Sequence, residues 1–73
     1  MPVIDWQPGL TGTVTGRGWT ASGMVNAVSE YSVFVQYIWP GTDRDRYDAF
    51  RKSDGPTLKR HGCTDVRFTV DQA

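Results

Sequence analysis

The sequence has little of what catalytic and metal sites are usually built from. Its 73 residues include a single cysteine, Cys63, and a single histidine, His61. One cysteine cannot form an intramolecular disulfide, and one cysteine with one histidine cannot complete a four-ligand zinc site without carboxylates. The composition therefore excludes a disulfide scaffold, and it fits the reducing environment of the cytoplasm.

An excess of charge of one sign is also missing. The 8 Lys and Arg residues are balanced by 8 Asp and Glu residues, so the formal net charge is +0. A dedicated nucleic-acid binder usually carries a basic excess, because phosphate contacts dominate its affinity. Any basic patch on this protein must therefore be offset by acidic residues elsewhere.

Long hydrophobic runs are absent as well. The longest apolar candidate, residues 33–39, is interrupted by Gln36 and falls far short of the roughly 20 residues that a membrane helix needs. The opening segment, Met1 to Trp6, has neither the basic region nor the long apolar region of a signal peptide. We therefore expect a cytoplasmic protein without membrane contact, located in the host cytoplasm if a phage encodes it.

The residues that are present suit one small domain. Hydrophobic residues make up 38% of the chain and aromatic residues 12%, and large aromatic side chains help a small core to bury enough area. A domain of this size buries only about 60% of the surface that its unfolded chain exposes. We expect an N-terminal arm at residues 1–8, a single β domain at 9–70 and a C-terminal tail at 71–73.

Alternation of apolar and polar residues predicts β-strands in four places, at residues 10–15, 24–29, 32–39 and 63–70. The third of these is apolar on both faces, with Val33, Val35, Tyr37 and Trp39 on one face and Phe34 and Ile38 on the other. Such a strand is expected at the centre of a barrel or sandwich, or with its outer face covered.

The remaining segments carry weaker signals. We expect loops at residues 19–23 and 53–62, where glycine and proline interrupt the pattern. In residues 43–52, the spacing of Tyr47 and Phe50 suits one helical turn, whereas a short strand would place Tyr47, Ala49 and Arg51 together. We prefer a short helix or turn. Together these elements predict a mainly β fold, either a small barrel or a curled antiparallel sheet of four or five short strands, with at most one short helix.

Residues 9–39 resemble a known type of small barrel. The resemblance rests on the run Pro8-Gly9-Leu10-Thr11-Gly12-Thr13-Val14, followed by Gly23-Met24-Val25 and by Val33-Phe34-Val35-Gln36-Tyr37. This order is similar to the Gly-x-Val strand and following hairpin of SH3-like barrels of the KOW and Tudor type. The resemblance implies an SH3-like barrel, in families that bind nucleic acid, ribosomes, RNA polymerase or methylated peptides. The aromatic cage of a Tudor domain does not map onto this chain, so the resemblance carries over no functional residue.

Three motifs that could carry chemistry do not meet its requirements. His61 and Cys63 could pair as base and nucleophile, but no third group is placed to orient the histidine. A calcium loop that starts at Asp43 would need Gly at its sixth position and Glu at its twelfth, where this chain has Asp48 and Asp54. The glycines near the N-terminus lack the Gly-Lys-Ser/Thr ending of a phosphate loop. We therefore expect no catalytic residue, no metal site, no cofactor and no enzymatic activity.

Nine residues are candidates for contact with a partner: Trp6, Trp19, Arg44, Arg46, Tyr47, Arg51, Lys52, Lys59 and Arg60. The two tryptophans fall in segments without a strand pattern, and tryptophan is enriched at interface hot spots. The other seven belong to a basic segment, residues 44–61, in which aromatic rings alternate with cations as they do on nucleic-acid surfaces. Aspartates in and beside that segment weaken its field.

These candidates support three hypotheses. The first is a non-enzymatic protein-binding module, of the kind that a phage uses to regulate or inhibit a host machine such as RNA polymerase. The alternative is a nucleic-acid-binding SH3-like barrel that uses residues 44–61. The third is assembly through an unpaired strand edge, and we expect a monomer or a weak homodimer. Convergence of the basic residues on one face would favour nucleic acid, whereas an exposed apolar patch containing Trp6 and Trp19 would favour a protein partner.

Overall fold

The chain folds into a closed antiparallel barrel of six strands. The computed structural model describes residues 4–71, apart from the side chains of residues 63 and 64. The strands follow one another around the barrel, and β6 returns to pair with β1. Their bounds are β1 Thr11–Gly16, β2 Trp19–Val28, β3 Ser32–Ile38, β4 Asp45–Arg51, β5 Thr57–Arg60 and β6 Cys63–Val70. The small β-barrel is confirmed, with six strands instead of four or five, and the described residues contain no helix.

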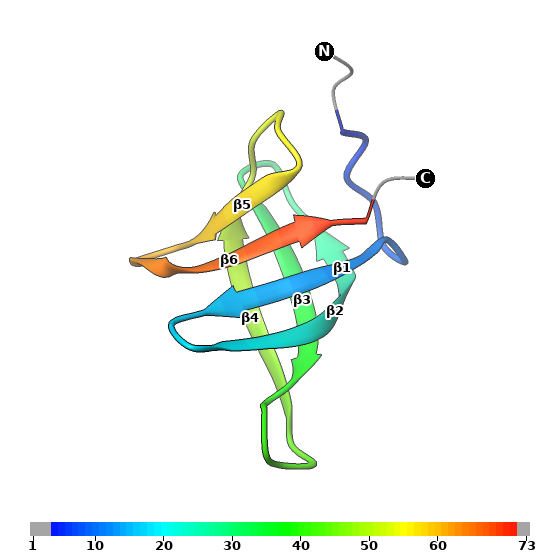
Figure 1. Ribbon diagram of the computed structural model, residues 1–73. Coiled ribbons are helices and arrows are strands. Elements are labelled where there is room, and N and C mark those ends of the chain that lie inside the picture. The colour runs from blue at the N-terminus through cyan, green and yellow to red at the C-terminus, as the bar shows by residue number, and fades with distance from the viewer. Residues whose placement is uncertain (1–3, 72–73) are drawn as a thin grey trace.

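The arrangement of the strands divides the barrel wall into two parts. Figure 1 shows β3 and β4 running steeply across β1 and β6, with the β3–β4 hairpin projecting beyond the rest of the barrel. The long strand β2 pairs with β1 through its first half and with β3 through its second half. A bulge between Val25 and Ala27 bends it where the two parts meet.

Three expectations about local structure were wrong. In the segment 43–52, residues Asp45–Arg51 form β4, which pairs with β3 from Ser32–Arg51 to Ile38–Asp45 and leaves no helical turn. Residues 19–23 open β2, because they pair along β1 from Gly16–Trp19 to Gly12–Gly23. Residues 57–60, expected in a loop, form β5 against β6. In each case, hydrogen bonding to a neighbouring strand makes the segment a strand, although its own sequence lacks a clear alternation of apolar and polar residues.

The core lies where the predicted alternation places it. Val33, Val35 and Tyr37 point inward from β3, and Val66, Phe68 and Val70 point inward from β6. The other buried hydrophobic residues are Trp6, Val14, Val25, Phe50 and Leu58. Phe50 and Phe68 meet at the centre, with their ring centroids 6.0 Å apart. Aromatic rings and aliphatic side chains, most of them valines, therefore fill the barrel.

Two glycines allow β1 and β2 to approach this core closely. Gly12 and Gly23 are directly opposite each other in the β1–β2 pairing. A Cβ at Gly12 would lie 2.2 Å from the carbonyl oxygen of Thr69 and 2.8 Å from the Phe68 ring. A Cβ at Gly23 would lie 2.9 Å from methyl carbons of Val14 and Val35. Only the absence of a side chain lets this part of the wall lie so close to the core.

Candidate functional site

The basic segment expected at residues 44–61 does not form one surface. Arg46 and Arg60 occupy inward-facing positions on β4 and β5. Both side chains lie toward one end of the barrel, where each contacts a neighbour. Lys52 follows β4, and its ammonium donates to the carbonyl oxygen of Ser29 over 3.4 Å. Arg44 lies in the β3–β4 loop, while Lys59 points outward from β5. Arg51 is exposed at the end of β4. The cations that sequence reasoning grouped are thus spread around the molecule.

Trp6 belongs to the core instead of to an exposed patch. It is only 7% exposed, and its ring centroid lies 6.2 Å from that of Phe68. Its indole nitrogen donates a 2.9 Å hydrogen bond to the backbone carbonyl of Ser53. The ring is occupied by contacts within the chain, so we exclude Trp6 from the partner surface.

Trp19 is half-buried at one end of the barrel. Its ring stacks on Tyr37 with centroids 5.9 Å apart and packs against Trp39 with centroids 5.0 Å apart. The guanidinium carbon of Arg46 lies 4.6 Å from the centre of the Trp39 ring, in a cation–π contact. These side chains cover the end of the barrel, which gives Trp19 a structural role whether or not its edge meets a partner.

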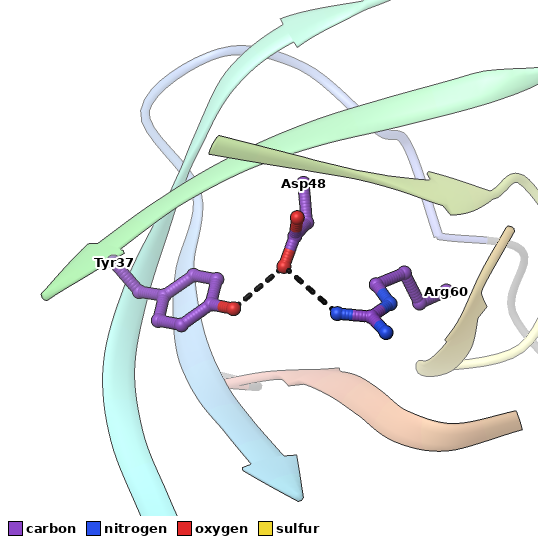
Figure 2. Close-up of polar contacts among 3 residues, drawn as sticks. All are labelled: Tyr37, Asp48 and Arg60. Atoms are coloured by element: carbon purple, nitrogen blue, oxygen red, sulfur yellow. Dashed lines mark hydrogen bonds and ion pairs between the residues drawn. The ribbon is translucent and has the colours of Figure 1, made fainter. Parts of the chain in front are cut away.

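A part-buried polar cluster lies just inside that end (Figure 2). The phenol of Tyr37 donates a 2.6 Å hydrogen bond to a carboxylate oxygen of Asp48. The same oxygen lies 3.5 Å from a guanidinium nitrogen of Arg60, in an ion pair whose side chains are 15% and 27% exposed for Asp48 and Arg60. Burial, followed by the hydrogen bond and the charge of Asp48, raises the pKa of Tyr37 to about 12. The hydrogen bond and the ion pair give each of the three polar groups a partner, which suits a structural role at the end of the core.

The outer wall carries an apolar surface that includes only one of the predicted contact residues, Tyr47. We call it the apolar face; it consists of Met24, Phe34, Ile38 and Tyr47, which are 42%, 38%, 54% and 59% exposed. The pairing registers connect them through Gln36, which is opposite both Met24 on β2 and Tyr47 on β4. Phe34 and Ile38 flank Gln36 on β3. The sequence signal was the apolar outer side of β3, which predicted a strand at the centre of a barrel or sandwich or one with its outer face covered. The strand lies in a barrel, and Phe34 and Ile38 on its outer side are open to solvent.

Beside the apolar face, the wall is hollowed. We call this feature the acidic hollow; it has Met24 and Ile38 on its floor and Asp45 and Asp71 on opposite sides, and it is also lined by Gly12 and Gly23. Its volume is about 460 Å³, within the range of roughly 300–1,000 Å³ that ligand pockets occupy.

A second, larger depression has mixed polarity. It lies between the N-terminal segment, the β2–β3 turn and the loop after β4, with a volume of about 890 Å³. Its charged lining combines acids and bases: Asp5, Glu30, Asp54, Arg51, Lys52 and His61. His61 is exposed, and its Nε2 lies 2.9 Å from the hydroxyl oxygen of Ser32. The pair of His61 and Cys63, considered above as base and nucleophile, involves the side chain of Cys63, which lies outside the described part of the structure.

The face formed by β1, β5 and β6 differs in chemistry. Exposed hydroxyl side chains form one row across four strands, namely Ser22, Thr13, Thr69 and Thr57. Two of these hydroxyls, on Thr57 and Thr69, are 3.1 Å apart. In the next row Lys59 and Arg67 are directly opposite each other and both exposed. Sequence reasoning identified Lys59 but not its neighbour Arg67, because only the pairing of β5 with β6 brings them together.

Among the side chains described in residues 4–62 and 65–71, no three of His, Asp or Glu come close enough together to hold a metal ion. No helix among those residues is long and apolar enough to cross a membrane. Comparison of the chain with protein-family models, with curated proteins and with solved structures finds no match in any of the three. The geometry of the surface is therefore the basis for any functional proposal.

Proposed function

We propose that this domain is a small non-enzymatic protein-binding module that docks through the apolar face. The observation that carries the proposal is the grouping of Met24, Phe34, Ile38 and Tyr47 on adjacent positions of three paired strands. Contiguous exposed apolar side chains of this kind mark interaction surfaces in folded proteins. Paired strands also hold their side chains rigidly, which lowers the entropy lost when a partner binds.

The non-enzymatic part of the proposal rests on the part-buried polar groups, which are engaged with one another. Asp48 accepts from Tyr37 and pairs with Arg60, an arrangement that stabilises the barrel end. The apolar face in turn contains no pair of titratable side chains suited to general acid and base roles.

The partner class to test first is a transcription complex. The KOW-like pattern of residues 9–39 motivates that choice by analogy, and a phage-type regulator that docks on bacterial RNA polymerase is the specific form of the proposal. The exposed tyrosine in the apolar face supports a protein partner, since tyrosine is enriched at interface hot spots.

The test compares the wild-type domain with two variants, both of which leave the net charge of the domain unchanged. Ile38→Ser with Tyr47→Ser removes the exposed apolar groups from two strands of the face, while Tyr31→Ser removes an aromatic residue that is 73% exposed outside it. Each tagged protein is used to capture partners from nuclease-treated bacterial lysate, and purified RNA polymerase is then measured directly by biolayer interferometry.

We expect the double variant to weaken capture and the Tyr31 variant to leave it unchanged. Equal capture by the two variants would show that the apolar face is not the docking site. Loss of capture with the double variant, together with no binding to purified polymerase, would retain the protein-binding module and reject the polymerase as its partner.

A second candidate function is supported by the β1–β5–β6 face. Lys59 and Arg67 are directly opposed without a carboxylate partner among the described residues, and hydroxyl groups surround them. Opposed like charges cost stability in a sheet, and cations with hydroxyls are the groups that contact nucleic-acid phosphates. Fluorescence anisotropy with a labelled single-stranded oligonucleotide tests this candidate. Binding that falls steeply with salt and weakens in Lys59→Ala and Arg67→Ala would favour it over docking through the apolar face.

A further inference from the structure

The acidic hollow has a defined physical origin. On the inner side of β1 and β2, Gly12 and Gly23 have no Cβ, and a Cβ at either position would collide with the core. The backbone therefore lies close to Phe68, and the outer surface above the two glycines is depressed. Because the depression comes from backbone positions in a paired sheet, it is present before any partner arrives.

The floor of the hollow is apolar and continuous with the apolar face. Met24 and Ile38 belong to both, at 42% and 54% exposure. Gln36 lies between them on the β3 side and offers an amide for hydrogen bonding. An apolar side chain of a partner that contacts the apolar face can therefore extend into the hollow over Met24 and Ile38, beside the Gln36 amide.

The two sides of the hollow carry carboxylates. Asp45 is opposite Ile38 on β4, and Asp71 follows β6 next to β1, so the two acids lie on opposite sides of the β2–β3 floor. Asp71 is held in place because its backbone N–H donates to the carbonyl of Thr11 at 2.8 Å and its carboxylate accepts from the Thr11 hydroxyl at 3.2 Å.

Neither carboxylate has a cation to neutralise it within residues 4–71. The ion pairs found there join Arg17 to Asp65 and Arg60 to Asp48. Arg46, which follows Asp45 on β4 and is opposite Tyr37, is placed over the Trp39 ring. The hollow thus combines an apolar floor with two carboxylates whose charge is open to a partner.

We infer that the partner inserts a lysine or arginine next to an apolar residue into the acidic hollow, an inference that rests on the proposed function. The long aliphatic stem of such a side chain covers Met24 and Ile38, and its charged end reaches a carboxylate at the side. Charge complementarity selects this occupant, because an acidic or purely apolar segment would leave Asp45 and Asp71 unpaired at the contact.

The experiment selects peptides from a random dodecapeptide display library on the immobilised folded domain. Three double variants are compared with wild type after circular dichroism has shown that each is folded. Met24→Ser with Ile38→Ser removes the floor, and Asp45→Asn with Asp71→Asn removes the side charges. Asp5→Asn with Asp54→Asn removes the same number of exposed charges outside the hollow.

We expect wild type to enrich peptides in which Lys or Arg is adjacent to a large apolar residue. The Asp45/Asp71 variant should bind those peptides about three- to tenfold more weakly, because the inserted cation loses its ion pair and the second nearby charge, and with a weaker dependence on salt. The Asp5/Asp54 variant should bind as wild type does.

The outcomes separate the two proposals. Wild type could instead enrich apolar peptides that show no preference for Lys or Arg and that fail to bind the Met24/Ile38 variant. That result would overturn the inference about charge and leave protein binding in place. An equal loss of affinity in the two aspartate pairs would also overturn it, because the effect would then reflect net charge alone. Failure to enrich any peptide, or enrichment that is unaffected by removal of the floor, would overturn both.

Discussion

Replacement of Tyr37 by phenylalanine tests whether the part-buried polar cluster stabilises the barrel. The change removes one oxygen atom and keeps the ring that stacks on Trp19. Tyr37 is 2% exposed, and its phenol donates to Asp48 at 2.6 Å. Without the phenol, the carboxylate of Asp48 keeps Arg60 but loses its second partner at a largely buried position.

The expected loss of stability follows from the charge of the acceptor. A hydrogen bond to a charged group contributes about 1.5–3 kcal/mol to the free energy of unfolding. In a domain of this size each kcal/mol changes the midpoint of thermal unfolding by roughly 4–8 °C. Tyr37→Phe should therefore lower the melting temperature by roughly 6–24 °C at neutral pH, measured by tryptophan fluorescence, and lower the unfolding free energy measured with urea.

The same pair predicts a pH dependence at the alkaline end. The pKa of Tyr37 rises from an ordinary value of 10.0 to about 12 in the folded protein. Between these values the unfolded chain has lost the phenolic proton while the folded chain retains it, so stability falls as pH rises. The contribution is fully present below pH 10 and is lost by about pH 12, and its size is on the order of 3 kcal/mol.

The advantage of wild type over Tyr37→Phe should consequently shrink between pH 10 and pH 12. Tyr47→Phe is the matched control, since Tyr47 is 59% exposed and its hydroxyl makes no hydrogen bond within the described residues. We expect that variant to stay within about 0.5 kcal/mol of wild type. A Tyr37→Phe protein as stable as Tyr47→Phe at neutral pH, or a constant difference up to pH 12, would refute the role given to the cluster.

Three other changes test the wall and the core. Gly23→Ala should cost about 1–3 kcal/mol in unfolding free energy, because its Cβ would lie 2.9 Å from core methyl groups; Gly55→Ala, with no atom within 4 Å of its Cβ, should leave the melting temperature unchanged or slightly higher. Trp6→Phe should cost about 1–3 kcal/mol in chemical denaturation, because it leaves a part-buried carbonyl without its donor. Lys59→Glu should stabilise the barrel by about 0.2–1 kcal/mol at low salt, with the gain lost in high salt, since it places opposite charges across from Arg67.

Much of the fold could be predicted because several strands carry their own periodicity. The alternation of Val33, Val35 and Tyr37 and that of Val66, Phe68 and Val70 both match inward positions. The exposed threonines of β1 likewise follow the predicted outward face. Burial of one face of a strand imposes a period of two on its sequence, and that period is visible without knowledge of the partner strand.

Strands β4 and β5 could not be predicted in the same way. On β4 the inward positions include Arg46 and Asp48, which face the polar end of the barrel, so the apolar period is absent. On β5 a single buried residue, Leu58, is too short a signal. Both segments are strands because β3 and β6 supply hydrogen-bonding partners for them, which is a property of the assembled sheet.

Contacts between residues far apart in the sequence also decided which of the candidate contact residues lie together on the surface. Trp6 became a core residue through its contacts with Phe68 and with the carbonyl of Ser53, whose position is 47 residues away along the chain. The apolar face could have been found in part from Phe34 and Ile38 on the outward side of β3, whereas Met24 and Tyr47 join it only through the pairing registers. Arg67 could not have been paired with Lys59 before the β5–β6 register was known.

The sequence by itself determined a small β domain, its inward-facing residues on the strongly periodic strands, and the balance of charge. These properties depend on the spacing and kind of residues along the chain, which local sterics and burial translate directly into strands. Only the tertiary structure decided which side chains meet: the Tyr37–Asp48–Arg60 cluster, the apolar face and the acidic hollow. Each brings together residues from two or more strands, and barrel closure sets their neighbours through registers that no single segment encodes.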